Sequence, residues 1–494
     1  MSLKRLVALG VCLICFSNLY SQNQDRLWMM GYGCCGSPNF TGINMDFRSG
    51  SLVVTSEQRH FNFSDTNGQI CDSLGNPLFF TNGIFVSNAL DDTMLNGGGL
   101  NPSAYTASQS VYGLRIPQAN LVLPMPGDNS KFYLIHSTAD DMSNTYATYY
   151  LYYSIIDMTL DGGLGGVVQK NTVLLHDSLV GGMMTATKHA NGRDWWLVAH
   201  QFRTTNSFRF LLTPNGVQGP WIDNLSTWRN NYFGQAVFSQ DGSKYVYYEP
   251  YGDLDIWDFD RCTGIFSNQI HVTINDSTGA GGAAFSRTGR FLYVSSINYV
   301  YQFDMHAVDV GSSKTTVAVY DGYTSNGLTP TVFFQQQLAP DGRIYINSSS
   351  SVADYHVINS PDSAGLACDL QQHSIRLPGY SVSLPNHPNY YLGAEFGSAC
   401  DSLTNDIPRI SNAVESFYIF PNPARDNLYI TQSKSEQIQT ISFFNSLGQV
   451  QAIGYNAINN GEYVEANVSD LSSGIYYLEI LTARQKLVKK FIKD

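Results

Sequence analysis

A strand–turn–strand pattern with a glycine in its turn recurs through the middle of this 494-residue chain and constrains the fold more than any other feature. Three copies are clear, with turn glycines Gly242, Gly289 and Gly342 standing 47 and 53 residues apart. A tight hairpin turn requires positive φ, which glycine adopts at little steric cost. A repeat of this length predicts a stack or ring of β-sheets.

The same pattern extends toward the N-terminus around Gly75, Gly127 and Gly192. Six hairpins at intervals of roughly 50 to 60 residues predict six blades of a β-propeller. Strand-like stretches remain at 27–31, 43–47 and 380–396. Because propeller rings are commonly closed by a blade built from both chain ends, we predict an all-β fold whose seventh blade combines N- and C-terminal strands.

The composition agrees with this prediction and excludes several classes of protein. Aromatic residues make up 13% of the chain, 43 residues are glycine, and only 14% are charged. This composition favours strands and turns over helical bundles or coiled coils. The net charge is −12, and residues 22–413 alone carry −13. We therefore expect no nucleic-acid partner, since such binding depends on a basic surface.

The N-terminus has the pattern of a secretory signal peptide. Lys4 and Arg5 precede an apolar run at 6–16, and a polar segment follows from about residue 22. This run is shorter than the 18 or so residues of a membrane-spanning helix. We predict a signal peptide at 1–21 and no transmembrane segment in the mature chain.

Six cysteines follow the predicted signal peptide, and an exported protein can pair them as disulfides. The sequence leaves the connectivity open, since six cysteines allow fifteen pairings. The adjacent cysteines Cys34 and Cys35 could form a strained disulfide with each other, take part in two separate disulfides, or belong to a metal or redox site. The disulfide candidates are Cys34, Cys35, Cys71, Cys262, Cys368 and Cys400.

The last 80 or so residues have a different texture, with short alternating strands separated by tight turns, which predicts a small immunoglobulin-like β-sandwich. Several spaced motifs in this segment resemble the type A sorting domain of the Bacteroidetes type IX secretion system, the Por secretion tail. The motif residues are Pro421, Asn422, Pro423, Gly448, Asp470, Leu471, Gly474, Tyr476, Lys489 and Lys490.

This resemblance implies a destination for the protein. It predicts that residues 416–494 bind the type IX secretion machinery and direct passage across the outer membrane. Cargo of this family usually loses the sorting domain and is then attached to surface lipopolysaccharide or released. We therefore expect an extracellular or cell-surface protein with a propeller at 22–403 and a linker at 404–415.

The repeat region, from about residue 27 to residue 400, also resembles the β-propeller ectodomains of exported Bacteroidetes proteins. The resemblance rests on phrases such as Gly-Asn-Pro-Leu-Phe-Phe at 75–80, Lys-His-Ala-Asn-Gly-Arg-Asp-Trp-Trp at 188–196 and Ser-Leu-Pro-Asn at 383–386. Trp257-Asp258 is similar to the WD dipeptide of WD40-like repeats. That family has no settled activity, so it implies no catalytic residue.

The sequence contains no serine-hydrolase elbow, P-loop, zinc-protease or dinucleotide-binding motif. We therefore assign no catalytic and no cofactor-binding residue from the sequence, which leaves the cofactor unknown. One acidic run, Asp253, Asp255, Asp258 and Asp260, is a weak candidate for a Ca²⁺ site, because calcium prefers several carboxylate and carbonyl oxygens. Apolar residues interrupt this run, so capping of turns at a blade edge is the competing interpretation.

Two hypotheses about function remain. The protein is a displayed binding module for an extracellular polysaccharide, peptide or surface protein, which the lack of a catalytic motif favours. Alternatively, it is a secreted glycan lyase or hydrolase with carboxylates gathered at the mouth of the propeller channel. A propeller fold alone does not choose between them.

Overall fold

The computed structural model describes most of the chain outside its N-terminus and a central linker. It describes residues 23–33, 39–140, 142, 147–225, 228, 234–276, 279–401, 417, 419–431, 438–445, 449–458, 463–482 and 486–494. The predicted signal peptide, the linker at 404–415, Cys34, Cys35 and Gly448 lie outside these residues. The chain divides into two compact units, Met1–Leu403 and Thr404–Asp494.

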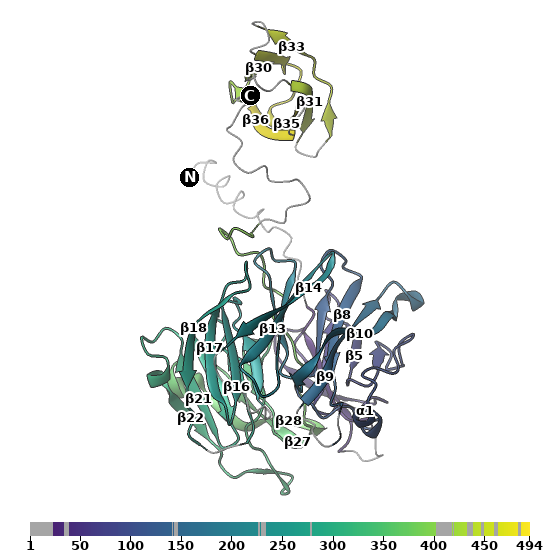
Figure 1. Ribbon diagram of the computed structural model, residues 1–494, viewed down its shortest axis with the longest axis vertical. Helices are drawn as coiled ribbons and strands as arrows, with labels where there is room; N and C mark the ends of the chain where they lie inside the picture. The colour runs from purple at the N-terminus through teal and green to yellow at the C-terminus, as the bar shows by residue number, and fades with distance from the viewer. Residues whose placement is uncertain are drawn as a thin grey trace, which may run out of the picture. The chain divides into compact units, whose positions relative to one another are not determined.

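Seven antiparallel sheets and one two-stranded ribbon make up the described part of the first unit (Figure 1). Two sheets have three strands: β1 (Leu27–Gly31), β2 (Gly42–Asp46), β3 (Val53–Glu57); and β4 (Gly68–Cys71), β5 (Pro77–Thr81), β6 (Val86–Asn88). The next three have four strands each: β7 (Asn120–Pro124), β8 (Lys131–Ser137), β9 (Ala147–Asp157), β10 (Gly166–Val180); β11 (Thr185–Lys188), β12 (Trp195–His200), β13 (Asn206–Thr213), β14 (Gly216–Asn224); and β15 (Gln235–Phe238), β16 (Lys244–Glu249), β17 (Asp253–Phe259), β18 (Phe266–Val272).

The last two sheets also have four strands: β19 (Gly281–Phe285), β20 (Phe291–Ser296), β21 (Tyr299–Asp304), β22 (Thr315–Val319); and β25 (Gln336–Leu338), β26 (Ile344–Ile346), β27 (Val352–Ile358), β28 (Leu370–Ser381). The ribbon pairs β23 (Thr324–Ser325) with β24 (Thr329–Pro330). Short helical turns are α1 (Ala104–Ser108) and the 3-10 turns Asp161–Gly163, Gly311–Ser313 and Gly365–Cys368.

Each of the seven sheets pairs its strands in chain order, up and down, as the hairpin repeat predicts. The six predicted turn glycines join the first and second strands of the second to seventh sheets, and their φ angles lie between 72° and 85°. At Gly242 a Cβ atom would also lie 2.5 Å from Thr187 Oγ1. The prediction of glycine turns is therefore confirmed.

Consecutive sheets lie next to one another, and the last sheet packs against the first. First strands are neighbours in most successive pairs: β1 with β4, β4 with β7, β11 with β15, β15 with β19 and β19 with β25. Between the last and first sheets, Trp28 packs against Phe47 and Tyr345 with ring centroids 5.0 and 5.8 Å apart. Backbone contact continues there, since Tyr380 N–H donates to the Asn39 carbonyl at 2.8 Å. This arrangement is that of a β-propeller.

The predicted seventh blade, built from both chain ends, is wrong in the strand pairing that the structure describes. The sheet that contains β1 and β2 takes its third strand from Val53–Glu57, so all three strands come from the N-terminal side. Of the predicted C-terminal stretch at 380–396, only Tyr380 and Ser381 lie in a strand, at the end of β28. The residues after Ser381 do not form a strand of this sheet, and they take part in the candidate site described below.

The second unit consists of two four-stranded antiparallel sheets. One contains β29 (Ile419–Phe420), β30 (Asn427–Thr431), β33 (Tyr455–Ile458) and β34 (Tyr463–Asn467); the other contains β31 (Ile438–Asn445), β32 (Val450–Gln451), β35 (Gly474–Thr482) and β36 (Lys486–Lys493). Their buried side chains form one core that includes Leu428, Ile430, Phe443, Leu478 and Phe491. Two sheets facing a shared apolar core are consistent with the predicted β-sandwich.

Candidate functional site

Residues 382–391, called the strap below, run through the centre of the first unit. Val382 lines a pocket at one end, Asn386 to Asn389 line a central cavity, and Tyr391 lines a pocket at the other end. The central cavity measures about 40 Å³, which is room for one or two water molecules and too small for a ligand. The strap therefore fills the space that the first strands surround, and two larger pockets lie at its two ends.

Polar side chains hold the strap in place at its middle. The Asn386 amide nitrogen donates to the carbonyl oxygens of Asn120 at 2.9 Å and Met184 at 3.1 Å. Its amide oxygen accepts from Gln118 Nε2 at 3.1 Å. Tyr390 adds a hydrogen bond to the Val122 carbonyl at 2.9 Å. These contacts satisfy polar groups that the strap would otherwise bury without partners.

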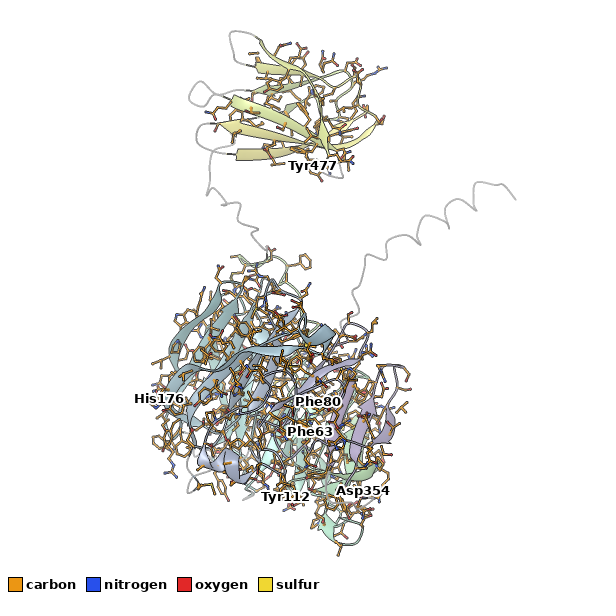
Figure 2. All side chains as sticks on the ribbon, turned by 90° about the vertical axis from the view of Figure 1, so that its right-hand side faces the viewer. Phe63, Phe80, Tyr112, His176, Asp354 and Tyr477 are labelled. Atoms are coloured by element: carbon orange, nitrogen blue, oxygen red, sulfur yellow. A yellow bond between two sulfur atoms is a disulfide. The ribbon has the colours of Figure 1, made fainter. Side chains whose placement is uncertain are left out.

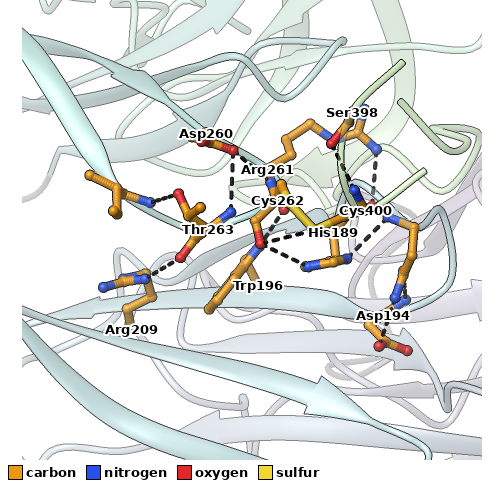
Figure 3. The surroundings of a disulfide bond; sticks show 12 residues. His189, Asp194, Trp196, Arg209, Asp260, Arg261, Cys262, Thr263, Ser398 and Cys400 are labelled. Carbon is orange, nitrogen blue, oxygen red and sulfur yellow. Dashed lines mark hydrogen bonds between the residues drawn. A yellow bond between two sulfur atoms is a disulfide. The ribbon is translucent and has the colours of Figure 1, made fainter. Parts of the chain in front are cut away.

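A disulfide and an arginine anchor the chain after it leaves the channel (Figure 3). Cys400 is bonded to Cys262, which follows β17 and stands 138 positions earlier in the sequence. Arg261 donates to the Gly393 carbonyl at 2.6 Å and to the His189 carbonyl at 3.2 Å. Glu395 N–H donates to the Ala190 carbonyl at 2.8 Å. Side-chain, backbone and covalent contacts thus fix the strap from its middle to its end.

One mouth holds a pocket of about 580 Å³, which we call the aromatic pocket. It is lined by Tyr32, Phe40, Ser64, Asp65, Tyr105, Tyr112, Arg115, Pro117, Ala280, Phe334, Ser349, Ser350, Ser351 and Val382. Tyr112 is 41% exposed and lies at the edge of the first unit in Figure 2. The Tyr32 hydroxyl and Ser351 Oγ are 2.6 Å apart, which ties the first sheet to the loop before β27. Aromatic rings and hydroxyl groups thus share one concave surface.

The charged groups of the aromatic pocket are Asp65 and Arg115. Burial raises the pKa of the Asp65 carboxyl to about 6, against smaller opposing effects of the Ser64 hydroxyl and the Arg115 guanidinium. Ser64 Oγ lies 3.4 Å from Asp65 Oδ2. Arg115 is exposed, so its donors face solvent at the pocket. At neutral pH the pocket carries one negative and one positive group, with aromatic surface around them.

The opposite mouth holds a second pocket of about 340 Å³, called the arginine pocket. It is lined by Asp25, Arg26, Gln240, Arg287, Gln337, Leu338, Ala339, Pro340, His387, Pro388, Asn389 and Tyr391. The strap supplies His387, Pro388, Asn389 and Tyr391 to its wall. The two mouths therefore differ in character, one aromatic and neutral, the other polar with two guanidinium groups.

The four aspartates proposed for calcium do not form one site. Asp253 and Asp255 stand five and three positions before Asp258, so strand alternation directs Asp258 to the opposite face of β17. Asp255 accepts from His271 Nδ1 at 2.9 Å, Asp258 pairs with Lys244 at 2.7 Å, and Asp260 accepts from Cys262 N–H at 2.8 Å. Over the described ranges, no three His, Cys, Asp or Glu side chains are grouped as metal ligands. These contacts are ion pairs and turn hydrogen bonds, so they agree with the competing interpretation that the aspartates cap turns.

The cysteines proposed for disulfides fall into a bonded pair and free thiols. Cys262 and Cys400 are paired, whereas Cys71 and Cys368 are free and buried. Their proposed disulfide role is wrong in this structure, because Cys71 lies on β4 and Cys368 lies in the turn before β28, in different apolar clusters. Burial raises the pKa of the Cys71 thiol to about 12. Cys34 and Cys35 lie outside the described residues.

The sorting-motif residues gather where the two ends of the second unit meet. Asn422 Oδ1 accepts from Ile492 N–H at 2.8 Å, and Ala424 N–H donates to the Ile492 carbonyl at 2.7 Å. Pro421 and Pro423 flank Asn422 in this turn, while Lys489 and Lys490 lie on the partner strand β36.

The second group of motif residues forms the turn into β35. Leu471 N–H donates to the Val468 carbonyl at 3.1 Å, and exposed Asp470 precedes it. Gly474 begins β35, and the Tyr476 hydroxyl donates to the Ser472 carbonyl at 2.9 Å while its ring stacks on Phe491 at 5.6 Å. The motif therefore maps to a rigid turn and to the pairing of the first and last segments.

The strap and both pockets were absent from the predictions made from sequence. Residues 383–390 contain Ser-Leu-Pro-Asn-His-Pro-Asn-Tyr, where two prolines interrupt any strand pattern. Those prolines were the available signal against a strand. Asp65 and Arg115 stand 50 residues apart in loops, and nothing in their local sequence indicates that they meet.

A family model described as the secretion system C-terminal sorting domain matches residues 418–494. No curated protein matches the chain. Within the described ranges, no helix is long and apolar enough to cross a membrane.

Solved structures resemble the first unit at low identity. A candidate 6-phosphogluconolactonase from Bacteroides fragilis NCTC 9343 shows 11% identity and a TM-score of 0.44, covering 74% of this chain and 98% of that one. The Dos1 propeller shows 12% identity and a TM-score of 0.35, covering 66% and 90%. A gluconolactonase from Xanthomonas campestris shows 11% identity and a TM-score of 0.31, covering 65% and 94%. Similarity of this size transfers no activity.

Proposed function

Because this chain is a type IX secretion cargo that joins a β-propeller to a C-terminal sorting domain, we propose that it is an exported binding protein whose aromatic pocket takes a neutral oligosaccharide. The sorting domain indicates export to the cell surface or the medium and contact with the type IX machinery. The observation that carries the binding role is the aromatic pocket, with its tyrosines, serine hydroxyls and charged pair around about 580 Å³.

The chemistry of this pocket suits a sugar. Binding sites combine apolar and aromatic surface with a few polar groups that fix orientation. The exposed ring of Tyr112 can pack on the C–H face of a pyranose, and Tyr32 and Tyr105 are buried in the pocket wall, while Ser349, Ser350 and Ser351 provide hydroxyl groups. Asp65 accepts and Arg115 donates hydrogen bonds, so the pocket can pair with both functions of a sugar hydroxyl.

The alternative, a glycan hydrolase or lyase, is favoured by one observation. The pKa of Asp65, raised by burial to about 6, is suited to a general acid. Glycosidases, however, usually use two carboxyl groups about 5 to 10 Å apart, and among the described residues that line this pocket Asp65 is the one Asp or Glu. The strap also fills the channel in which a second carboxylate would be expected. Binding is therefore the better-supported role.

The finer organisation belongs to the same proposal. The seven sheets are assigned as seven blades, with the ring closed by packing of β28 beside β1 to β3. Residues 1–21 are assigned as the signal peptide, 22–403 as the propeller, 404–415 as a linker and 416–494 as the sorting domain. The sorting domain is removed at the surface, and the propeller is anchored there or released.

A glycan array with the purified secreted protein tests the binding role. We expect binding to neutral oligosaccharides, and Tyr112→Ala should weaken it by about tenfold through the loss of one aromatic contact. Tyr149→Ala is the matched control, because Tyr149 is equally exposed at 40% but lies on β9.

A reducing-end assay on each bound glycan then separates the two roles. Binding without product supports the proposed function. Product formation that is lost in Asp65→Asn would establish the enzyme instead. Binding to peptides but to no glycan on the array would contradict the assigned ligand class.

A further inference from the structure

The arginine pocket is an exception to the charge of the unit around it. Residues 22–413 carry a net charge of −13, yet this pocket brings together two guanidinium groups and one carboxyl. Both Arg26 and Arg287 act electrostatically on Asp25 and lower its pKa, so the three groups are close in space. They come from distant parts of the sequence, namely the segment before β1 and the turn between β19 and β20.

The arginines have donors left over after their contacts with the protein. Arg287 is exposed and uses Nη2 to donate to the Pro340 carbonyl at 2.9 Å. Arg26 is half-buried and uses Nη1 to donate to the Phe47 carbonyl at 3.3 Å. Its Nε is buried with no hydrogen-bond partner in the described part of the chain. An oxyanion would satisfy such donors, since guanidinium groups match carboxylate and sulfate geometry.

Asp25 and the strap complete the site. The Asp25 carboxyl accepts a hydrogen bond from the Tyr391 hydroxyl on the strap. Burial raises the pKa of Asp25 to about 6, although Tyr391, Arg26 and Arg287 all oppose the shift. As Asp25 takes up a proton, the pocket loses its negative group and keeps both positive ones.

Other titratable groups around Asp25 stay in one state between pH 5 and 7.5. Burial lowers the pKa of His387 to about 4 and raises the pKa of the Cys71 thiol to about 12. The pKa values of Tyr390 and Tyr391 are raised by burial as well. His387 Nε2 donates to the Gln69 carbonyl at 3.2 Å, and its Nδ1 has no partner in the described structure, so a neutral acceptor remains beside the arginines.

We propose that the arginine pocket is a second binding site, separate from the aromatic pocket, that takes the carboxylate or sulfate group of an acidic polysaccharide. Arg26 and Arg287 hold the oxyanion, and Asp25 makes its binding depend on pH. The strap separates this site from the aromatic pocket. The proposal stands on the arginine pocket alone and does not depend on the ligand of the other mouth.

Titration calorimetry of the full secreted protein tests this site with polygalacturonate, dextran sulfate and neutral dextran. We expect binding of at least one acidic polymer that depends on Arg287, whereas any binding of neutral dextran should not depend on Arg287. Arg287→Ala should weaken that binding by about tenfold or more, the effect of losing one charge-assisted contact. Arg290→Ala is the control, because Arg290 belongs to the same hairpin but pairs with Asp304 at 2.9 Å.

The pH dependence provides a second readout. The probes stay ionised between pH 5 and 7.5, whereas Asp25 becomes protonated as the pH falls through about 6. Binding should therefore be tighter at pH 5, by at most about 30-fold, which is the ratio of the protonated fractions. Asp25→Asn should bind tightly at both pH values.

Several outcomes would overturn the proposal. Failure to bind either acidic polymer would do so, as would unchanged binding of the acidic polymer in Arg287→Ala or equal losses in the Arg287 and Arg290 variants. Binding by Asp25→Asn that still tightens at pH 5 would remove Asp25 from the site. Preference for polygalacturonate or dextran sulfate identifies the carboxylate or the sulfate as the recognised group, and melting curves of each variant show that it is folded.

Discussion

The aromatic pocket and the arginine pocket share one feature, a carboxyl group next to arginine, but differ in the residues around it. Each places one carboxyl, Asp65 or Asp25, next to arginine, and burial raises the pKa of both to about 6. At the aromatic pocket the carboxyl faces one arginine among tyrosines and serines. At the arginine pocket it faces two. One mouth is thus suited to neutral ligands and the other to anions.

The strap makes this difference possible. Asn386 to Asn389 of the strap leave a cavity of only about 40 Å³ between the two pockets. Asn386 and the Cys262–Cys400 disulfide hold the strap in place. Changes that loosen the strap should therefore affect both pockets, whereas changes in one pocket should leave the other intact.

Removal of the disulfide should have the largest effect. Cys262→Ser combined with Cys400→Ser should lower the free energy of unfolding of the first unit by about 2 to 5 kcal/mol, because a covalent link across a long loop is lost. Tryptophan fluorescence during chemical denaturation reports on this unit alone, since all six tryptophans lie in it. Wild-type protein in reducing buffer should match the double variant. An unchanged unfolding midpoint would show that the strap needs no covalent anchor.

Loss of the Asn386 side chain should have a smaller effect. Asn386→Ala removes three hydrogen bonds, one of them from Gln118 Nε2, which keeps its bond to the Ala236 carbonyl, and the loss should cost about 2 kcal/mol. Hydrogen exchange should become faster at residues 383–391. Asn298→Ala, at an exposed asparagine, is the control and should change neither measurement. Unchanged exchange in the strap of Asn386→Ala would mean that other contacts hold it.

Neutralising Asp65 should have the smallest effect, and its sign is set by pH. The folded state binds the proton of Asp65 more tightly than the unfolded state does, so this residue reduces stability increasingly as the pH rises toward and beyond 6. Asp65→Asn should therefore stabilise the protein by about 1 kcal/mol at pH 7.5 and by less at pH 4.5. Melting temperatures at the two pH values measure this difference. A larger gain at pH 4.5 would contradict a raised pKa.

The hairpins could be predicted from the sequence, but the binding sites could not. Glycine at a turn and alternation in the flanking strands are local signals, and Gly242, Gly289 and Gly342 occupy the predicted turns. The mixed seventh blade was wrong in its strand pairing because 380–396 was interpreted as a strand-like stretch, although only Tyr380 and Ser381 lie in a strand. Pro385 and Pro388 cannot donate to a sheet ladder, and the segment instead buries its polar groups against carbonyl oxygens of several sheets.

The pockets depend on contacts between residues far apart in the chain. Asp25 meets Tyr391 across 366 residues, and Tyr32 meets Ser351 across 319. Each of these residues has an ordinary local sequence. Only the tertiary fold brings them together, so a local pattern carries no information about them. Conversely, Asp255 and Asp258 are close in sequence on β17 but contact different partners, His271 and Lys244.

Titration of one neutral and one acidic glycan into wild-type protein, Tyr112→Ala and Arg287→Ala tests the central claim most directly, namely that the strap separates two independent binding sites. We predict that Tyr112→Ala weakens the neutral ligand alone and Arg287→Ala weakens the acidic ligand alone, each by about tenfold. Both ligands should also bind the wild-type protein at the same time. Competition between the two ligands, or loss of both in either variant, would contradict the claim.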